Sequence, residues 1–195
     1  MLHWIFDAGE PWRIIVVEGH VDLSFITDDM LSSIEFNEVN DVPHGNGLWT
    51  ELGIEEPKYV PGTTNVHQVF DTACPKWADK VKGLFPWVEH GSVTLNKLEP
   101  GQFIAPHADT LYRLKQYIKE RDLDIQDSKI VRVNIFLQDK QIGHFLDVGN
   151  VGIGEYRKGD YVLLYPGIIH TVGNLGYTNR YTMQITGIMK KREIK

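Results

Sequence analysis

Three residues have the types and the spacing of a metal site: His107, Asp109 and His170. Residues two apart in an extended strand lie on one face, about 7 Å apart along the chain, so His107 and Asp109 could converge on one ion while His170 arrives from another strand. Two imidazoles and one carboxylate leave positions of an octahedral Fe(II) open, whereas a structural tetrahedral zinc site is closed. The spacing therefore predicts a non-heme iron site. Two polar strand residues and an unrelated histidine are the alternative.

A candidate anion-binding face follows His170 by ten residues. In segment 180–186 polar and apolar side chains alternate, and the polar set is Arg180, Thr182, Gln184 and Thr186. On a surface strand this face would meet only solvent. Close to a metal, the leading arginine could bind a carboxylate through two parallel hydrogen bonds.

Two segments extend this pattern, Leu98-Glu-Pro-Gly-Gln-Phe-Ile-Ala-Pro-His107 and Lys158-Gly-Asp-Tyr-Val-Leu-Leu-Tyr-Pro-Gly-Ile-Ile-His170. Together with Asp109 and Arg180 they resemble the Fe(II)/2-oxoglutarate-dependent dioxygenases, over roughly residues 92–190. Within that superfamily, a set of residues resembles the aspartyl/asparaginyl β-hydroxylase branch: Arg132-x-Asn134, Gly159-Asp160, Asn174 and Arg180.

The chain departs from that branch at two positions. Asn134 stands where the branch has histidine, and Asp109 supplies a carboxylate that the best-known members of the branch lack. Asp109 instead resembles the commoner iron site of the prolyl-hydroxylase-like enzymes. The resemblance therefore implies Fe(II)- and 2-oxoglutarate-dependent oxidation but does not identify the substrate.

The resemblance also implies roles for individual residues. His107, Asp109 and His170 would bind Fe(II), and 2-oxoglutarate would chelate the iron through its 2-oxo acid end. The residues expected at its distal carboxylate are, in order of preference, Arg180, Thr182, Arg132 with Asn134, and Asn96. Arg132 and Asn134 share one face of a strand, and a solvent-facing position is the alternative for both. Iron, O2 and 2-oxoglutarate together would hydroxylate a substrate C–H bond.

Length and charge restrict the remaining possibilities. With 195 residues the chain is long enough for one well-packed core, and we expect a single domain, with residues 1–91 supporting a core of 92–190. A net charge of −6 makes a nucleic-acid partner unlikely. The single cysteine, Cys74, fits a reducing compartment, and the N-terminal segment lacks the features of a signal peptide. We expect a cytoplasmic protein without a membrane span.

The expected elements must carry the metal residues into one cavity. Seven strands are expected, at 92–98, 103–107, 129–138, 143–148, 159–165, 170–172 and 180–189. Two early ligands and one late ligand suit a double-stranded β-helix, the jelly-roll or cupin architecture, so the expected fold is mainly β with supporting helices. A further strand at 12–18, helices at 27–38, 75–85 and 110–121, and an irregular stretch at 40–66 complete the prediction.

Three functions stay open at the level of the sequence. The favoured one is a 2-oxoglutarate-dependent dioxygenase that hydroxylates an aspartyl, asparaginyl or prolyl side chain of a protein or peptide. The second is the same chemistry on a small molecule, and the third is a cupin-like metal- or ligand-binding module without oxidation. His144 is expected to be structural, with a role in the cavity as the alternative, and the oligomeric state is open.

Overall fold

The protein is described from a computed structural model of the whole chain. It describes residues 19–41, 53, 60, 62–123, 125 and 129–189. The strand expected at 12–18 and most of the irregular stretch 40–66 lie outside these residues.

Eight consecutive strands form a double-stranded β-helix. They are β4 (Val88–Leu98), β5 (Phe103–Ala108), β6 (Lys129–Phe136), β7 (His144–Val148), β8 (Val151–Gly152), β9 (Asp160–Leu164), β10 (Ile169–Asn174) and β11 (Arg180–Met189). The first pairs with the last, the second with the seventh, the third with the sixth and the fourth with the fifth, all antiparallel. This is a long hairpin rolled into two facing sheets, the jelly-roll topology expected from the sequence.

The two sheets have different sizes. The small sheet has the order β5-β10-β7-β8, and the large sheet has the order β1-β9-β6-β11-β4-β3-β2. The additional strands of the large sheet are β1 (Gly19–His20), β2 (Glu38–Asp41) and β3 (Asn65–Phe70). None of these three strands was predicted, because β2 and β3 lie at the ends of a stretch whose glycines and prolines indicated a loop.

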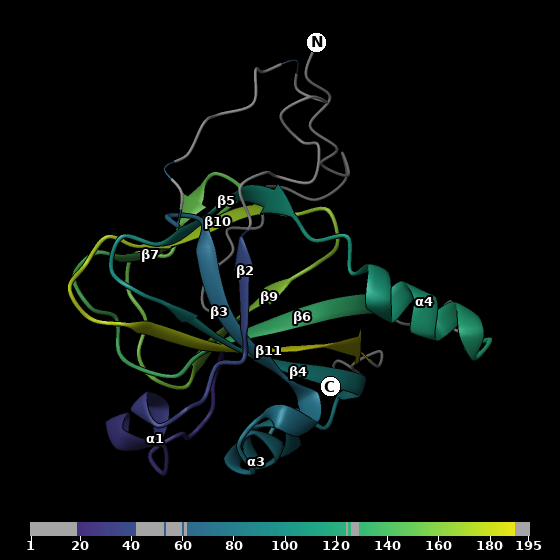
Figure 1. Cartoon of the computed structure of the whole chain (residues 1–195). Coiled ribbons are helices and arrows are strands. Elements are labelled where there is room, and N and C mark those ends of the chain that lie inside the picture. Colours follow the sequence, from purple (N-terminus) through teal and green to yellow (C-terminus); the bar gives the residue numbers. More distant parts are fainter. Residues whose placement is uncertain are drawn as a thin grey trace.

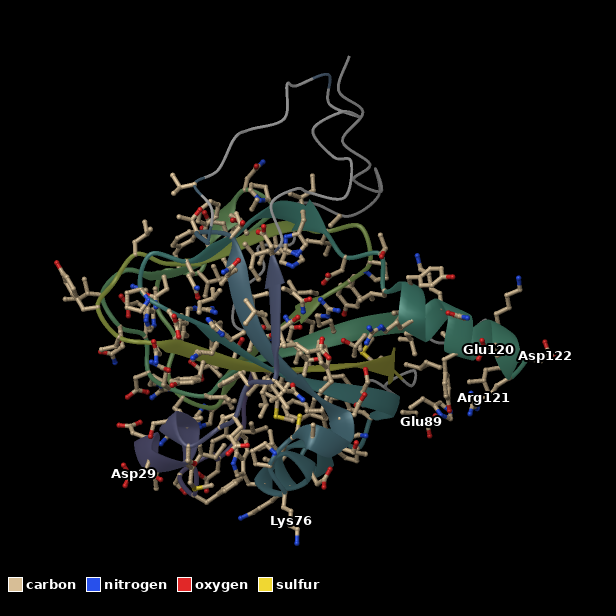
Figure 2. The ribbon with its side chains drawn as sticks, viewed as in Figure 1. Asp29, Lys76, Glu89, Glu120, Arg121 and Asp122 are labelled. Carbon is tan, nitrogen blue, oxygen red and sulfur yellow. The ribbon has the colours of Figure 1, made fainter. Side chains whose placement is uncertain are left out.

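Within the described residues, three α-helices lie outside the jelly roll. Figure 1 shows α1 (Asp28–Ser32) and α3 (Trp77–Gly83) on the side of the large sheet that faces away from β5, β7 and β10, and α4 (Tyr112–Glu120) projecting from one end. A 3₁₀ turn, η1 (Asp71–Ala73), precedes α3. The side chains of Glu120, Arg121 and Asp122 lie at the end of α4 that points away from the sheets (Figure 2). None of the helices in the described ranges is long and apolar enough to cross a bilayer.

The main core lies between α1, α3 and the outer face of the large sheet. Its members include Leu31, Val81, Phe85, Leu95, Val131, Val133, Ile135, Met183 and Ile185. A second apolar cluster lies inside the jelly roll and includes Phe136, Leu146, Tyr156, Val162 and Leu164. The apolar positions of β6 and β11 thus belong mostly to the outer face, which leaves their alternate positions for the space between the sheets.

The predicted helices are present, and one is shorter than expected. Thr27 caps α1 by accepting a hydrogen bond from the Met30 amide at 3.2 Å, but the helix ends at Ser32 instead of continuing to residue 38. The hydroxyls of Ser32 and Ser33 bond to the Asp29 and Met30 carbonyl groups, a local pairing that competes with further helical hydrogen bonds. The chain then enters β2.

Candidate metal centre and its cavity

The three predicted metal residues come together where β5 and β10 pair. His107 on β5 lies directly opposite His170 on β10, and Asp109 follows the end of β5 by one residue. One ligand atom from each of the three side chains lies within 4.8 Å of the other two. The Nε2 atoms of His107 and His170 are 3.9 and 3.7 Å from the Asp109 carboxylate oxygens.

A β-bulge next to Pro106 sets the orientation of His107. His170 pairs with His107, yet Val172 pairs with Ile104, so β5 contains one extra residue in this interval. Proline has no N–H to give to the ladder, which makes Pro106 a natural bulge position. Ile104 and His107 are three positions apart, a spacing that puts side chains on opposite faces of a regular strand; here both line the same cavity.

Both imidazoles are held so that Nε2 faces the centre. The Nδ1 atom of His107 is 2.8 Å from the Ala105 carbonyl oxygen, and the Nδ1 atom of His170 is 3.0 Å from the Ile168 carbonyl oxygen. Nδ1–H donates in both contacts, which leaves the Nε2 lone pair for a metal. Burial, and then the neighbouring His107, lower the pKa of His170 to about 4, so this imidazole is neutral at neutral pH. Two imidazole nitrogens and a carboxylate fit a divalent transition-metal ion.

Asp109 also forms an ion pair inside the site. The Nη1 atom of Arg132 donates to Asp109 Oδ2 at 2.5 Å, and Nε of the same guanidinium donates to Thr186 Oγ1 at 3.0 Å. The arginine therefore connects the carboxylate to β11 across the space between the sheets. Such a partner fixes the direction of a metal-binding carboxylate.

A cavity of about 210 Å³ lies between the two sheets and contains the metal residues. All eight residues selected from the sequence line it: Asn96, His107, Asp109, Arg132, Asn134, His170, Arg180 and Thr182. Its other lining residues are Val66, Gln68, Leu98, Ile104, Leu146, Leu164, Val172 and Gln184. The structure thus brings the selected side chains together, while their roles toward iron and 2-oxoglutarate stay predictions.

The strand register explains the polar wall of this cavity. Along β11 the side chains of alternate residues face inward, and neighbouring strands add partners at the same levels. Thr182 pairs with Asn96 of β4, Gln184 pairs with Asn134 of β6, and Thr186 pairs with Arg132. Arg180 is therefore at one end of this wall and Arg132 near the other.

Arg180 is a buried cation with unpaired donors. Its residue is 3% exposed, and its Nε and Nη2 atoms have no hydrogen-bond partner. The Phe136 ring centroid is 5.9 Å from the centre of the guanidinium, and burial lowers the pKa of Arg180. A buried charge without a partner costs free energy, so this end of the cavity is suited to an anion.

Tyr156 is a neighbour of Arg180 that sequence reasoning missed. It lies in the loop between β8 and β9, stacks on Phe136 with 3.7 Å between ring centroids, and its hydroxyl is buried near the Arg180 guanidinium. Burial raises the pKa of this phenol, and the nearby Arg180 counteracts that shift. An aromatic residue in a loop carries no periodic signal, so nothing in the sequence marked Tyr156.

Two glutamines extend the polar wall. Gln68 of β3 donates to Asn96 Oδ1 at 2.7 Å and accepts a hydrogen bond from Asn40 Nδ2, and Gln184 Nε2 is 3.5 Å from Asn134 Oδ1. Gln184 belonged to the polar set of 180–186 but received no role. Gln68 was overlooked because β3 was not predicted. These amides present both donors and acceptors to the cavity.

His144 and α4 lie outside the lining of the cavity. His144 is buried, its Nε2 atom is 3.2 Å from the Thr178 carbonyl oxygen, and burial lowers its pKa. This supports the structural role expected for it. Tyr112 at the start of α4 is exposed, and the Arg113 guanidinium lies 5.7 Å from the Phe70 ring centroid.

Comparisons with known proteins give similarities of fold only. No family model and no curated protein match the chain. Among solved structures, a prolyl-4-hydroxylase from Pseudomonas putida is similar over 74% of this chain and 82% of its own, with 17% identity and a TM-score of 0.42.

Two further solved structures are also similar in fold. A predicted oxalate decarboxylase from Thermotoga maritima is similar over 64% of this chain and 82% of its own, with 14% identity and a TM-score of 0.37. A cupin 2 conserved barrel domain protein from Rhodopseudomonas palustris is similar over 70% of each chain, with 11% identity and a TM-score of 0.39. The fold assignment above comes from the strand order, and these similarities add no activity to it.

Proposed function

We propose that this protein is an Fe(II)- and 2-oxoglutarate-dependent dioxygenase that hydroxylates a C–H bond of an aspartyl, asparaginyl or prolyl side chain in a protein or peptide. One observation carries the proposal: the three metal-ligating side chains and the unpaired, buried Arg180 line the same cavity. An open metal site and a cation for a dicarboxylate are the two requirements of this reaction class.

The residues would divide the work as follows. His107 and His170 would hold the ion through Nε2, and Asp109 through a carboxylate oxygen. Arg180 would bind the distal carboxylate of 2-oxoglutarate. The Thr182 hydroxyl, two residues further along β11 on the same face, would assist it. When bound, the iron supplies the activation of O2. The polar wall and the apolar residues opposite would hold the substrate still and exclude water.

Arg132 and Asn134 were also candidates for the distal carboxylate. The two donors of Arg132 that bind Asp109 and Thr186 make it less suitable than Arg180, whose Nε and Nη2 atoms have no hydrogen-bond partner. Arg180 is therefore the residue we assign to that carboxylate. Asn96, whose Oδ1 accepts from Gln68 Nε2, would contribute through its side-chain N–H donors.

Hydroxylation of a small molecule is the second candidate. A cavity of about 210 Å³ is smaller than the ~300–1,000 Å³ of typical ligand pockets, so it would admit a side chain or a compact molecule but no large ligand. A cupin-like metal-binding module without oxidation would need no anion at Arg180, so the unpaired guanidinium favours the enzyme.

The decisive experiment is anaerobic addition of Fe(II) and 2-oxoglutarate to metal-free protein, followed by visible spectroscopy. The expected result is an iron-to-2-oxoglutarate charge-transfer absorption that His170→Ala abolishes. Arg180→Ala should require at least ~10-fold more 2-oxoglutarate, because a buried charge-assisted pair is lost. Arg121→Met, at the far end of α4, is the matched control and should behave as wild type (Figure 2). Absence of the absorption in iron-loaded wild type would refute the dioxygenase and favour the metal-binding module.

A further inference from the structure

We infer that the substrate carries a carboxylate and that Arg132 binds this group beside the metal centre. The inference rests on the proposed function, because it assigns the Arg180 end of the cavity to 2-oxoglutarate. It narrows the substrate class to anionic side chains or acids, in preference to neutral amides and to proline.

Arg180 and Arg132 lie at opposite ends of the cavity. Arg180 begins β11, and Arg132 pairs with Thr186, six positions further along the same strand. At about 3.4 Å per residue these levels are ~20 Å apart. The hydrogen bond from Arg132 Nε to Thr186 keeps its guanidinium at its own level. A carboxylate held by Arg180 therefore leaves Arg132 for another group.

The charge balance of the cavity calls for one more anion. Asp109 is the sole carboxylate among the described lining residues, and Arg132 and Arg180 are the two permanent cations, so the metal-free cavity has a net charge of +1. A divalent ion raises this charge to +3, and the dianion 2-oxoglutarate lowers it to +1. The remaining positive charge is on the Arg132 side, because Asp109 is shared with the metal. A monoanionic substrate would neutralise it.

Arg132 can bind a second carboxylate without releasing Asp109. Its bonds to Asp109 and Thr186 use two of the five N–H donors of a guanidinium. The residue lies beside apolar Leu164, its pairing partner on β9, and its side chain is 21% exposed. In such a partly buried site an ion pair is stronger than at the surface. Arg132 is thus both the partner of Asp109 and the only described lining cation left for a substrate.

The test measures discrimination between a carboxylate and its isosteric amide. The protein is loaded with Mn(II) and N-oxalylglycine, an unreactive analogue of 2-oxoglutarate, so that no turnover is needed. Calorimetry then gives Kd values for two pairs of N-acetyl amino-acid amides, Asp against Asn and Glu against Gln. In wild type, the carboxylate member of at least one pair should bind ~10-fold tighter or more.

Two substitutions separate this role from support of the metal residue. Arg132→Met should reduce the carboxylate preference to less than about twofold, and Arg132→Lys, which keeps the charge, should retain part of it. Arg121→Met should keep the full preference. If Arg132→Met also weakens Mn(II) binding, the Kd ratio of carboxylate to amide in Arg132→Lys still tests the role of residue 132.

The outcomes distinguish the inference from the function on which it rests. A wild-type protein that binds Mn(II) and N-oxalylglycine but prefers no carboxylate overturns the anionic substrate and leaves the dioxygenase intact. Equal preference in wild type and Arg132→Met also overturns it, because the anion would then be recognised elsewhere. A wild-type protein that does not bind N-oxalylglycine contradicts the proposed function, and the inference fails with it.

Discussion

Along β11, the two faces of the large sheet have opposite character. On the outer face, Met183 and Ile185 of β11 are fully buried among apolar side chains below α1 and α3. On the inner face, Arg180 and Thr182 of the same strand are almost as well buried, but in a polar cavity. Burial is therefore not what separates the two faces. The difference is whether the buried groups have partners.

This difference separates stability from function within one strand. Apolar burial on the outer face contributes to stability in proportion to the area removed from water. Burial of an unpaired guanidinium on the inner face opposes folding. A protein retains such a group where a ligand supplies the missing partner, and we expect the two faces to respond to mutation in opposite ways.

The largest effect should come from breaking the outer face at Ile185. Ile185→Ala should lower the free energy of unfolding by about 2–5 kcal/mol, because a cavity forms in a close-packed core. Gln184→Ala, one residue earlier on the inner face, should cost less than ~1 kcal/mol. Denaturant titration of both variants measures this contrast. Equal costs would show that the inner face is part of the structural core.

Acid should destabilise the metal-free protein through His170, which lies on the small sheet across the cavity from this inner face. The pKa of His170 is lowered to about 4 from an ordinary value of 6.5, so the unfolded chain takes up this proton first as the pH falls. The free energy of unfolding is therefore unaffected by this proton above pH ~6.5. It falls progressively as the pH drops toward 4, by at most ~3 kcal/mol. Urea unfolding at pH 7, 5.5 and 4.5 should show a steeper loss for wild type than for His170→Gln. Parallel pH profiles would contradict this prediction.

The smallest effect has the opposite sign. Arg180→Met should stabilise the metal-free protein by ~1–2 kcal/mol, since it replaces an unpaired buried charge with an apolar group of similar length. Arg121→Met on α4 should change stability by less than ~0.5 kcal/mol. Thermal or chemical unfolding compares the three proteins. Destabilisation by Arg180→Met would mean that the guanidinium is already satisfied in the free protein.

Periodicity accounts for most of what could be predicted. All seven predicted strands from 92 to 189 are present, because their apolar residues alternate or form short buried runs, and α3 and α4 follow from their helical spacing. The jelly-roll order followed from the positions of His107 and His170 along the chain. The site residues on these strands could be predicted for the same reason.

Features that depend on distant contacts were missed. Strand β3, and with it Gln68, is formed by pairing with β4 on one side and β2 on the other, and nothing local distinguishes its sequence from the loop before it. The bulge at Pro106 and the loop residue Tyr156 likewise acquire their positions from neighbours far along the chain. The ion pair between Arg132 and Asp109 could not be predicted, because two residues on one polar wall carry no information about which donor meets which acceptor.

The pairing of β5 with β10 bears on the order of events during synthesis. His107 and His170 can meet only after β6 to β9, which lie between them along the chain, and β10 have been synthesised. Contacts so distant in sequence form late and slowly. Metal ions would therefore enter a jelly roll that is already assembled and would not nucleate it. The polypeptide can fold in the metal-free state and afterwards bind whichever divalent ion is available.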